Sequence, residues 1–220
     1  LRRIRDFVAT RIRRVGPGLA SLPLSAISAA DTTLSDGYGN MTDHAVLLSV
    51  MITAAGMQPE FVVSSSLPNI ERLRVPFETS PNPDLFTTLL VRVKSAAVEG
   101  DEAYLYFGDS DQYDQPGVTG FENMLALELA GATMFPIVSA YADTSERTYR
   151  IFVGAQGKTR VTIDSYYYGP SFGAYNKRYS EMTPEERRRH FQELVASVAQ
   201  SAKAVGNLRT NFKSYPGQIR

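Results

Sequence analysis

Residues 36–45, Asp36-Gly37-Tyr38-Gly39-Asn40-Met41-Thr42-Asp43-His44-Ala45, form a glycine-punctuated turn that leads into an apolar segment ending at Met57. Glycine frees the backbone for a tight turn. Asn40 or Thr42 can cap a following helix, and the carboxylate of Asp43 suits its first turn, where the helix dipole favours negative charge. The pattern predicts a helix over residues 42–57, and the unpaired N–H groups at its start favour a functional site there.

The predicted helix is apolar around its whole circumference. Its apolar positions are not confined to one stripe, as shown by Ala45, Leu48, Val50, Ile52 and Ala55. A helix of this kind is typical of a buried position under a sheet. Strand patterns follow at 60–66, 85–93 and 103–107, with a proline-containing loop expected over 67–83 and a turn over 95–101. The sequence thus predicts an α+β fold in which this helix is central.

The N-terminal part of the chain carries a second helical pattern. Residues 1–15 place apolar side chains at helical spacing, opposite a basic face that we expect to be solvated. Gly16-Pro17-Gly18 ends this pattern, and residues 19–34 are expected to form a loop. An amphipathic helix therefore precedes the central helix.

The C-terminal part predicts a β-hairpin followed by a long helix. Residues 148–154 and 159–168 alternate like paired strands around a turn at Gln156-Gly157. Thr183-Pro184-Glu185-Glu186 has the form of a capping box, and the helix that it opens is expected to end near Gly206. We place a soft boundary near Ala130, which gives a core over 1–130 and a hairpin-plus-helix segment over 131–220.

Composition excludes several classes of function. The chain has 23 Lys and Arg against 23 Asp and Glu, so it lacks the basic excess that drives nucleic-acid binding. No apolar run is long enough to predict membrane insertion. The absence of cysteine excludes thiol catalysis, disulfides and thiolate metal sites, and we expect no cofactor or metal. Because the chain does not begin with Met, we expect it to be a fragment of a longer protein.

The central segment resembles the nucleophile segment of the transglutaminase-like superfamily, in the bacterial group where this core lies inside a larger multidomain protein. The family pattern reads roughly Gly-Tyr-Gly-Asp-Cys-Lys-Asp-His-Ala, followed by Leu-Leu and Ala-Gly. The matching residues are Gly37-Tyr38-Gly39, Asp43-His44-Ala45, Leu47-Leu48 and Ala55-Gly56. The family Asp is Asn40 here, and the nucleophilic Cys is Met41.

The resemblance continues in the strands. Phe86-Thr87-Thr88-Leu89-Leu90-Val91 resembles the family strand Phe-Asn-His-Val-Leu-Val, so the position of the catalytic His falls on Thr88. Tyr104-Leu105 begins a segment that keeps an acid at Asp109, the third triad position. The resemblance implies an α+β transglutaminase-like (papain-like) core with a central helix packed on an antiparallel sheet, followed by a β-rich segment and a long helix.

The residues at the implied nucleophile and base positions cannot perform the catalytic chemistry of the family. A thioether such as that of Met41 has no proton and is no nucleophile for carbonyls, and the hydroxyl of Thr88 cannot act as a general base near pH 7. The resemblance therefore implies a pseudoenzyme, with Met41, Thr88 and Asp109 as vestigial triad positions. A ligand groove for a peptide, a glycan or a partner protein is expected to be lined by Tyr38, Asn40, Met41, His44, Thr88 and Asp109.

Two alternatives stay open. The first is a structural spacer in contact with neighbouring domains of the same chain, in a periplasmic or cell-envelope protein, a location that the resemblance implies. The second is an active transglutaminase-like or cysteine-peptidase-like hydrolase or acyl transferase of unusual mechanism, which would need a base such as His44.

Other candidate residues favour structural roles. His190 follows three arginines on a helix face that we expect to be solvated. The serines at 64–66 and Ser110 lie in no Gly-x-Ser-x-Gly turn. Asp109, Asp111 and Asp114 match only part of a calcium loop. The aromatic run Tyr166-Tyr167-Tyr168 fits either a ligand groove or a packed core.

Overall fold

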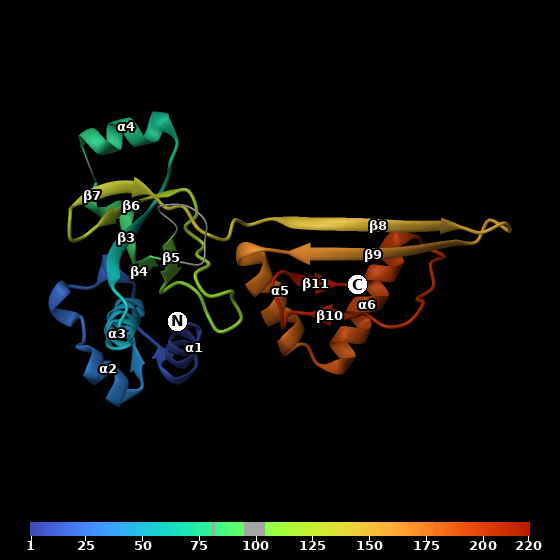
Figure 1. The fold of residues 1–220 in the computed structure, drawn as a ribbon, viewed down its shortest axis with the longest axis horizontal. Coiled ribbons are helices and arrows are strands. Elements are labelled where there is room, and N and C mark those ends of the chain that lie inside the picture. The colour runs from blue at the N-terminus through green and yellow to red at the C-terminus, as the bar shows by residue number, and fades with distance from the viewer. Residues whose placement is uncertain (81, 95–103) are drawn as a thin grey trace. The chain divides into compact units, whose positions relative to one another are not determined.

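A computed structural model describes residues 1–80, 82–94 and 104–220 of the chain. These residues divide into two compact units (Figure 1). Unit 1 comprises residues 1–112 and 116–142, and unit 2 comprises residues 113–115 and 143–220. The turn expected over 95–101 lies outside the described residues, as does Ala103 at the start of one expected strand.

Unit 1 contains an antiparallel sheet of five strands in the order β5-β4-β3-β6-β7. The strands are β3 Pro59–Pro68, β4 Phe86–Lys94, β5 Tyr104–Phe107, β6 Met124–Glu128 and β7 Thr133–Pro136. The first three confirm predicted strands. The sequence did not identify β6 and β7. Because β7 pairs with β6, the chain divides after Ala142, whereas we expected a boundary near Ala130.

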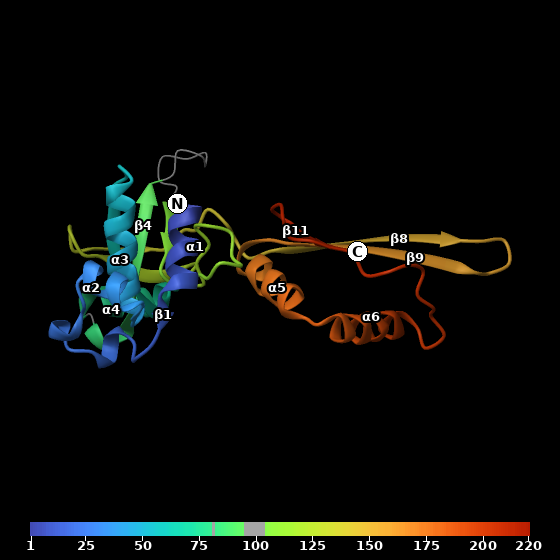
Figure 2. The same ribbon diagram turned by 90° about the horizontal axis from the view of Figure 1, so that it is seen from below.

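The helices of unit 1 are α1 Arg2–Arg11, α2 Ala30–Asp36, α3 Met41–Ala54 and α4 Glu71–Thr79. α1 and α3 lie along one face of the sheet, next to β4 (Figure 2). The core on this face consists of Val8, Ile12, Ala45, Leu47, Leu48, Ile52, Val63, Leu89, Val91, Val93 and Phe107. Unit 1 is therefore a mixed α+β unit in which α3 packs on an antiparallel sheet.

The other face of the same sheet carries a separate apolar cluster. Its buried members are Val62, Leu90, Tyr106, Ala126 and Ile137. Successive residues of a strand point to opposite faces, so neighbours such as Leu89 and Leu90 belong to different clusters. We call the face that α1 and α3 cover the helix face, and the other one the rear face.

Two helices and several short elements were not predicted. Most fall in segments expected to form loops, but a short strand at Arg13–Arg14 falls in the segment expected to be helical, since α1 ends at Arg11. α2 is followed by its C-cap Gly37, whose φ of 70° is left-handed. α4 buries only Phe77 and contains Pro76, so the sequence of α4 resembles that of a loop. Arg13–Arg14 (β1) and Tyr38–Gly39 (β2) form a parallel pair. Short 3-10 helices lie at η1 Leu19–Ser21, η2 Leu24–Ala26 and η3 Pro83–Leu85. α3 itself ends at Ala54, before the predicted end at Met57.

Unit 2 is a four-stranded antiparallel sheet in the order β10-β11-β9-β8, with two helices on one side of it (Figure 2). Its elements are β8 Ser145–Val153, β9 Thr159–Tyr167, α5 Gly169–Glu181, α6 Pro184–Val198, β10 Thr210–Asn211 and β11 Gly217–Ile219. β8 and β9 confirm the predicted hairpin. The capping box at Thr183 is present, with the Glu186 N–H donating to Thr183 Oγ1 at 3.3 Å.

In unit 2 the structure corrects the end of one helix, adds another helix, and decides between the two roles left open for Tyr167. α6 ends at Val198 and not near Gly206, because Ala199 is fully extended at φ −165° and ψ 149°. The sequence did not identify α5. Tyr167 belongs to the core of the unit together with Tyr179 and Ile219, so this member of the aromatic run packs internally.

Candidate functional site

The start of α3 is capped by its own side chains. Asn40 Oδ1 accepts the backbone N–H groups of Thr42, at 2.8 Å, and Asp43, at 3.0 Å. In return, Asp43 Oδ2 accepts the backbone N–H of Asn40 at 2.9 Å. This reciprocal capping box satisfies the N–H groups of Asn40, Thr42 and Asp43, which an isolated helix N-terminus would offer to an anionic ligand.

Asp43 also fixes the preceding segment. Its other oxygen, Oδ1, accepts the backbone N–H of Ser28 at 2.7 Å, fifteen positions earlier in the chain. Gly39 allows this arrangement, because a Cβ atom there would lie 2.8 Å from Asp43 Cβ and 3.0 Å from Thr33 Cγ2. The glycine and acidic residues of the central segment therefore serve close packing and capping around α3.

The vestigial triad positions Met41 and Thr88 do not converge. Met41 is the first residue of α3, which covers the helix face of the sheet. Thr88 is paired with Ser64, two positions before the pair of Leu90 with Val62, and that pair belongs to the rear-face cluster. Since side chains alternate along a strand, Thr88 points to the rear face. This register does not favour one groove that includes both residues.

Asp109 is half-buried, and its two carboxylate oxygens differ in their hydrogen bonds. Oδ2 accepts the Thr119 hydroxyl at 2.7 Å and the Gly120 N–H at 2.7 Å. Oδ1 is buried and has no hydrogen-bond partner among the described residues. Burial raises the pKa of Asp109, and the bonds from Thr119 and Gly120 oppose that rise, as does the positive charge of Arg14.

His44 is buried, with 3% of its surface exposed. Its ring is bonded to the backbone of Arg13, and Nε2 has no partner among the described residues. Burial lowers the pKa of His44, and the charge of Arg14 lowers it further, against smaller opposing effects of the Arg13 backbone and Asp43. These influences favour the neutral imidazole.

Arg14 influences two of the candidate residues, His44 and Asp109. The charge of Arg14 acts on both of the other groups. The parallel pairing of Arg14 with Gly39 places this arginine beside the start of α3. We expected Arg14 on the solvated face of a helix. The local sequence does not predict the position of Arg14, because the β1–β2 pairing joins segments that are distant in the chain.

Tyr38, the remaining groove candidate, is 51% exposed on β2. Asn40 is buried and serves as the helix cap. Of the six residues expected to line a groove, His44 and Asp109 each feel the charge of Arg14, Asn40 serves as a cap, and strand register assigns Thr88 to the rear face. The site can offer an imidazole nitrogen and a carboxylate oxygen. It contains no nucleophilic side chain at position 41.

His190 does not lie on a solvated face, as we had expected. Its side chain is 14% exposed, and Nε2 lies 2.9 Å from the Tyr179 hydroxyl. The ring packs at 5.8 Å from the Tyr179 ring, so His190 is a packing residue of unit 2.

The serine candidates on β3 are structural as well. Ser64 and Ser65 are fully buried, and each hydroxyl donates to a nearby backbone carbonyl, of Ser65 and Leu67 respectively. Across the residues that the structure describes, no group of three or more His, Cys, Asp and Glu side chains is placed to hold a metal ion. Within the same residues, no helix combines the length and apolar character that a bilayer span requires.

No family model matches the chain, and no curated protein matches it. A crystal structure of a candidate protease from Parabacteroides distasonis ATCC 8503 is similar, with a TM-score of 0.39 and 22% identity over 61% of this chain. The match covers 23% of that protein's chain. A likeness at this TM-score does not establish a shared fold.

Proposed function

We propose that unit 1 is a catalytically inactive, transglutaminase-like domain that acts as a scaffolding module in a larger bacterial envelope protein. The position of Thr88 carries this proposal. The residue at the expected base position lies on the rear face, while the residue at the nucleophile position begins the helix on the other face. A cysteine-type mechanism needs both groups in contact.

The start of α3 supports the same conclusion. Papain-like chemistry uses a thiolate at a helix N-terminus, where free N–H groups and the dipole stabilise negative charge. Here the side chains of Asn40 and Asp43 bond three of those N–H groups, and Asp43 brings its own carboxylate to the same place. A thiolate at position 41 would therefore be a second negative charge at a helix end where the carboxylate of Asp43 already lies.

A ligand-binding role is a second candidate. His44 Nε2 and Asp109 Oδ1 are both buried without partners among the described residues, and unsatisfied buried polar atoms are often completed by a ligand or water. The ligand classes that the resemblance favours are a peptide, a glycan or a partner protein.

The experiment that tests inactivity is an assay of the purified chain with fluorogenic peptide amides and with amine incorporation into a glutamine-containing protein. We expect no turnover above the rate without protein. Turnover that disappears in the Met41→Ala variant, with unchanged far-UV circular dichroism, contradicts the proposal. His44→Gln serves as the matched control, because loss of turnover in that variant alone identifies an enzyme with His44 as base.

Ligand binding is tested separately. Titration of the chain with peptide and glycan panels, followed by the NMR signals of His44, is expected to shift those signals if a ligand completes the site. Unchanged signals across the panels leave scaffolding as the function of unit 1.

A further inference from the structure

β8 is an open edge of the sheet in unit 2. It is the last strand in the order β10-β11-β9-β8, and all nine of its residues are exposed. Figure 1 shows it as a long, straight strand paired on one side only, with β9. An edge of this kind presents a row of unpaired backbone N–H and C=O groups to another strand.

This edge has few of the features that block pairing. β8 contains no proline, and its register with β9 runs without a bulge from Ser145–Tyr167 to Val153–Thr159. Large apolar side chains on it stay exposed, namely Ile151 at 63%, Phe152 at 70% and Val153 at 66%. Long, regular and partly apolar edges are the ones that recruit another strand.

The charges of β8 are self-complementary in one antiparallel register. We propose that β8 pairs with β8 of a second copy of this chain, about a twofold axis at Thr148. In that register, Glu146 lies opposite Arg150 of the partner subunit, and the symmetry repeats the pair. Thr148 then faces its own symmetry mate, and Arg147 lies opposite Tyr149 of the partner subunit. Opposite charges directly across a ladder stabilise it.

Neighbouring registers are less favourable. In an antiparallel ladder, residues directly opposite each other point to the same face of the sheet. A twofold axis perpendicular to the sheet must therefore lie midway between the two copies of one residue, so each register is named by that residue. An axis at Arg147 or at Arg150 places two like charges directly opposite each other, which destabilises a ladder. An axis at Tyr149 places the carboxylate of Glu146 opposite the apolar ring of Phe152. Thr148 is therefore the centre that the charge pattern selects.

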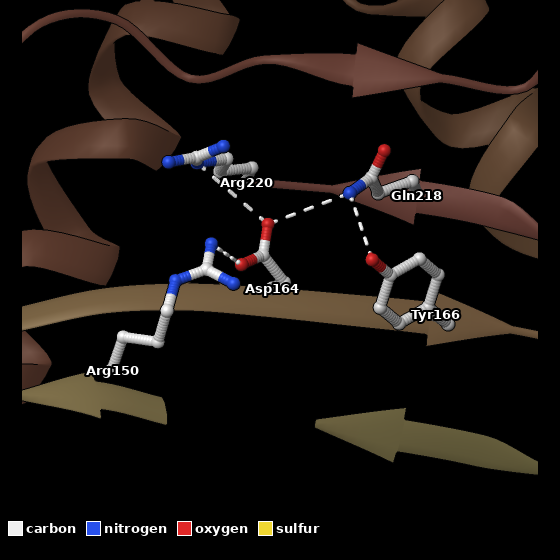
Figure 3. Close-up of polar contacts among 5 residues, drawn as sticks. All are labelled: Arg150, Asp164, Tyr166, Gln218 and Arg220. Carbon is white, nitrogen blue, oxygen red and sulfur yellow. Dashed lines mark hydrogen bonds and ion pairs between the residues drawn. The ribbon is translucent and has the colours of Figure 1, made fainter. Parts of the chain in front are cut away.

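Arg150 already forms an ion pair within its own sheet. Its Nη2 forms an ion pair with Asp164 Oδ2 on the neighbouring strand (Figure 3). The Asp164 side chain is only 3% exposed, and its Oδ1 is contacted by Gln218 Nε2 at 3.4 Å and by Arg220 Nε at 3.7 Å. The Arg150 side chain remains 57% exposed. A guanidinium has five N–H donors, so Arg150 can donate to a second carboxylate while it keeps the ion pair with Asp164.

Single-cysteine variants test the register directly, because the chain contains no cysteine. Residues opposite each other in an antiparallel ladder have Cα atoms about 4.5–5.5 Å apart, a separation that suits a disulfide. We expect Thr148→Cys to form a covalent dimer on mild oxidation of the full chain. An equimolar mixture of Ser145→Cys and Ile151→Cys chains is expected to form the mixed dimer.

The matched control is Ser145→Cys alone, which is expected to remain monomeric on non-reducing gels. Its two copies would be six positions apart along the ladder, roughly 20 Å. Efficient crosslinking of Ser145→Cys with itself, or failure of Thr148→Cys to crosslink, overturns the register.

Sedimentation of the cysteine-free chain tests the association itself. We expect a concentration-dependent dimer whose dissociation constant rises by about tenfold or more in Glu146→Arg, because two attractive pairs become repulsive. Glu181→Arg, which makes the same charge change on α5, is expected to leave the dimer intact. A chain that stays monomeric throughout overturns the proposal, and its edge then serves another protein or another part of the full-length chain. No residue of unit 1 takes part, so this outcome is independent of the proposed function.

Discussion

Strand register assigns Thr88 to the face of the unit 1 sheet that lies opposite α3, the helix that Met41 begins. Met41 opens the helix that packs with Leu89 and Val91, whereas Thr88 shares its face with Leu90. By this assignment, the two positions that the sequence resemblance gives to a nucleophile and a base are separated by the sheet. A substitution that restores either residue type alone cannot restore the contact between them.

Gly39→Ala is expected to destabilise unit 1 by about 1–3 kcal/mol, because overpacking of a close contact costs energy of this order. The added methyl would meet Asp43 Cβ at 2.8 Å and Thr33 Cγ2 at 3.0 Å, atoms near the backbone that cannot swing away. Gly18→Ala is the control, since nothing lies within 4 Å of the position that a Cβ atom would take there. Urea denaturation measures both, and equal midpoints contradict the packing argument.

Asn40→Ala is expected to lower the free energy of unfolding by about 1–2 kcal/mol, the usual cost of a lost N-cap. Its Oδ1 accepts two backbone N–H groups of α3, and the residue is 8% exposed, so water cannot fully replace it. Thr183→Ala, which removes the exposed cap of α6, is the comparison. A smaller loss for Asn40→Ala than for Thr183→Ala goes against the assigned role of the buried cap.

Acidification is expected to destabilise the chain through His44. Because burial lowers the pKa of His44 in the folded state, the unfolded chain binds this proton more readily. The contribution is complete above the unfolded pKa of about 6.5 and is lost as the pH falls below it toward the folded pKa. In His44→Gln, stability is expected to change less between pH 7 and 5. An identical pH dependence of both proteins rejects this assignment.

The start of α3 could be predicted from sequence because its determinants are local. The cap at Asn40, the carboxylate of Asp43 and the close approach at Gly39 all lie within five positions. The sequence did not predict α2 and α4, for different reasons. α2 is short, and α4 combines an internal Pro76 with a mostly exposed surface, so neither has a clear apolar stripe.

The composition of the site was only partly predictable. His44 and Asp109 were identified as neighbours of the α3 start, but Arg14 was not, because its position depends on the parallel pairing of β1 with β2. The face of Thr88 depends on strand register, and the β3–β4 register shifts between Ser64 and Ser65. A shift of one residue reverses the face of a side chain, and local sequence does not determine it.

The most direct test of the account is disulfide formation in a chain that has no other cysteine. Ser64 and Thr88 are paired on adjacent strands, so Ser64→Cys combined with Thr88→Cys is expected to lose both free thiols on oxidation. Met41→Cys combined with Thr88→Cys is expected to keep two free thiols, because the sheet separates them. A disulfide between positions 41 and 88 would show that the triad positions converge, and would contradict the central claim.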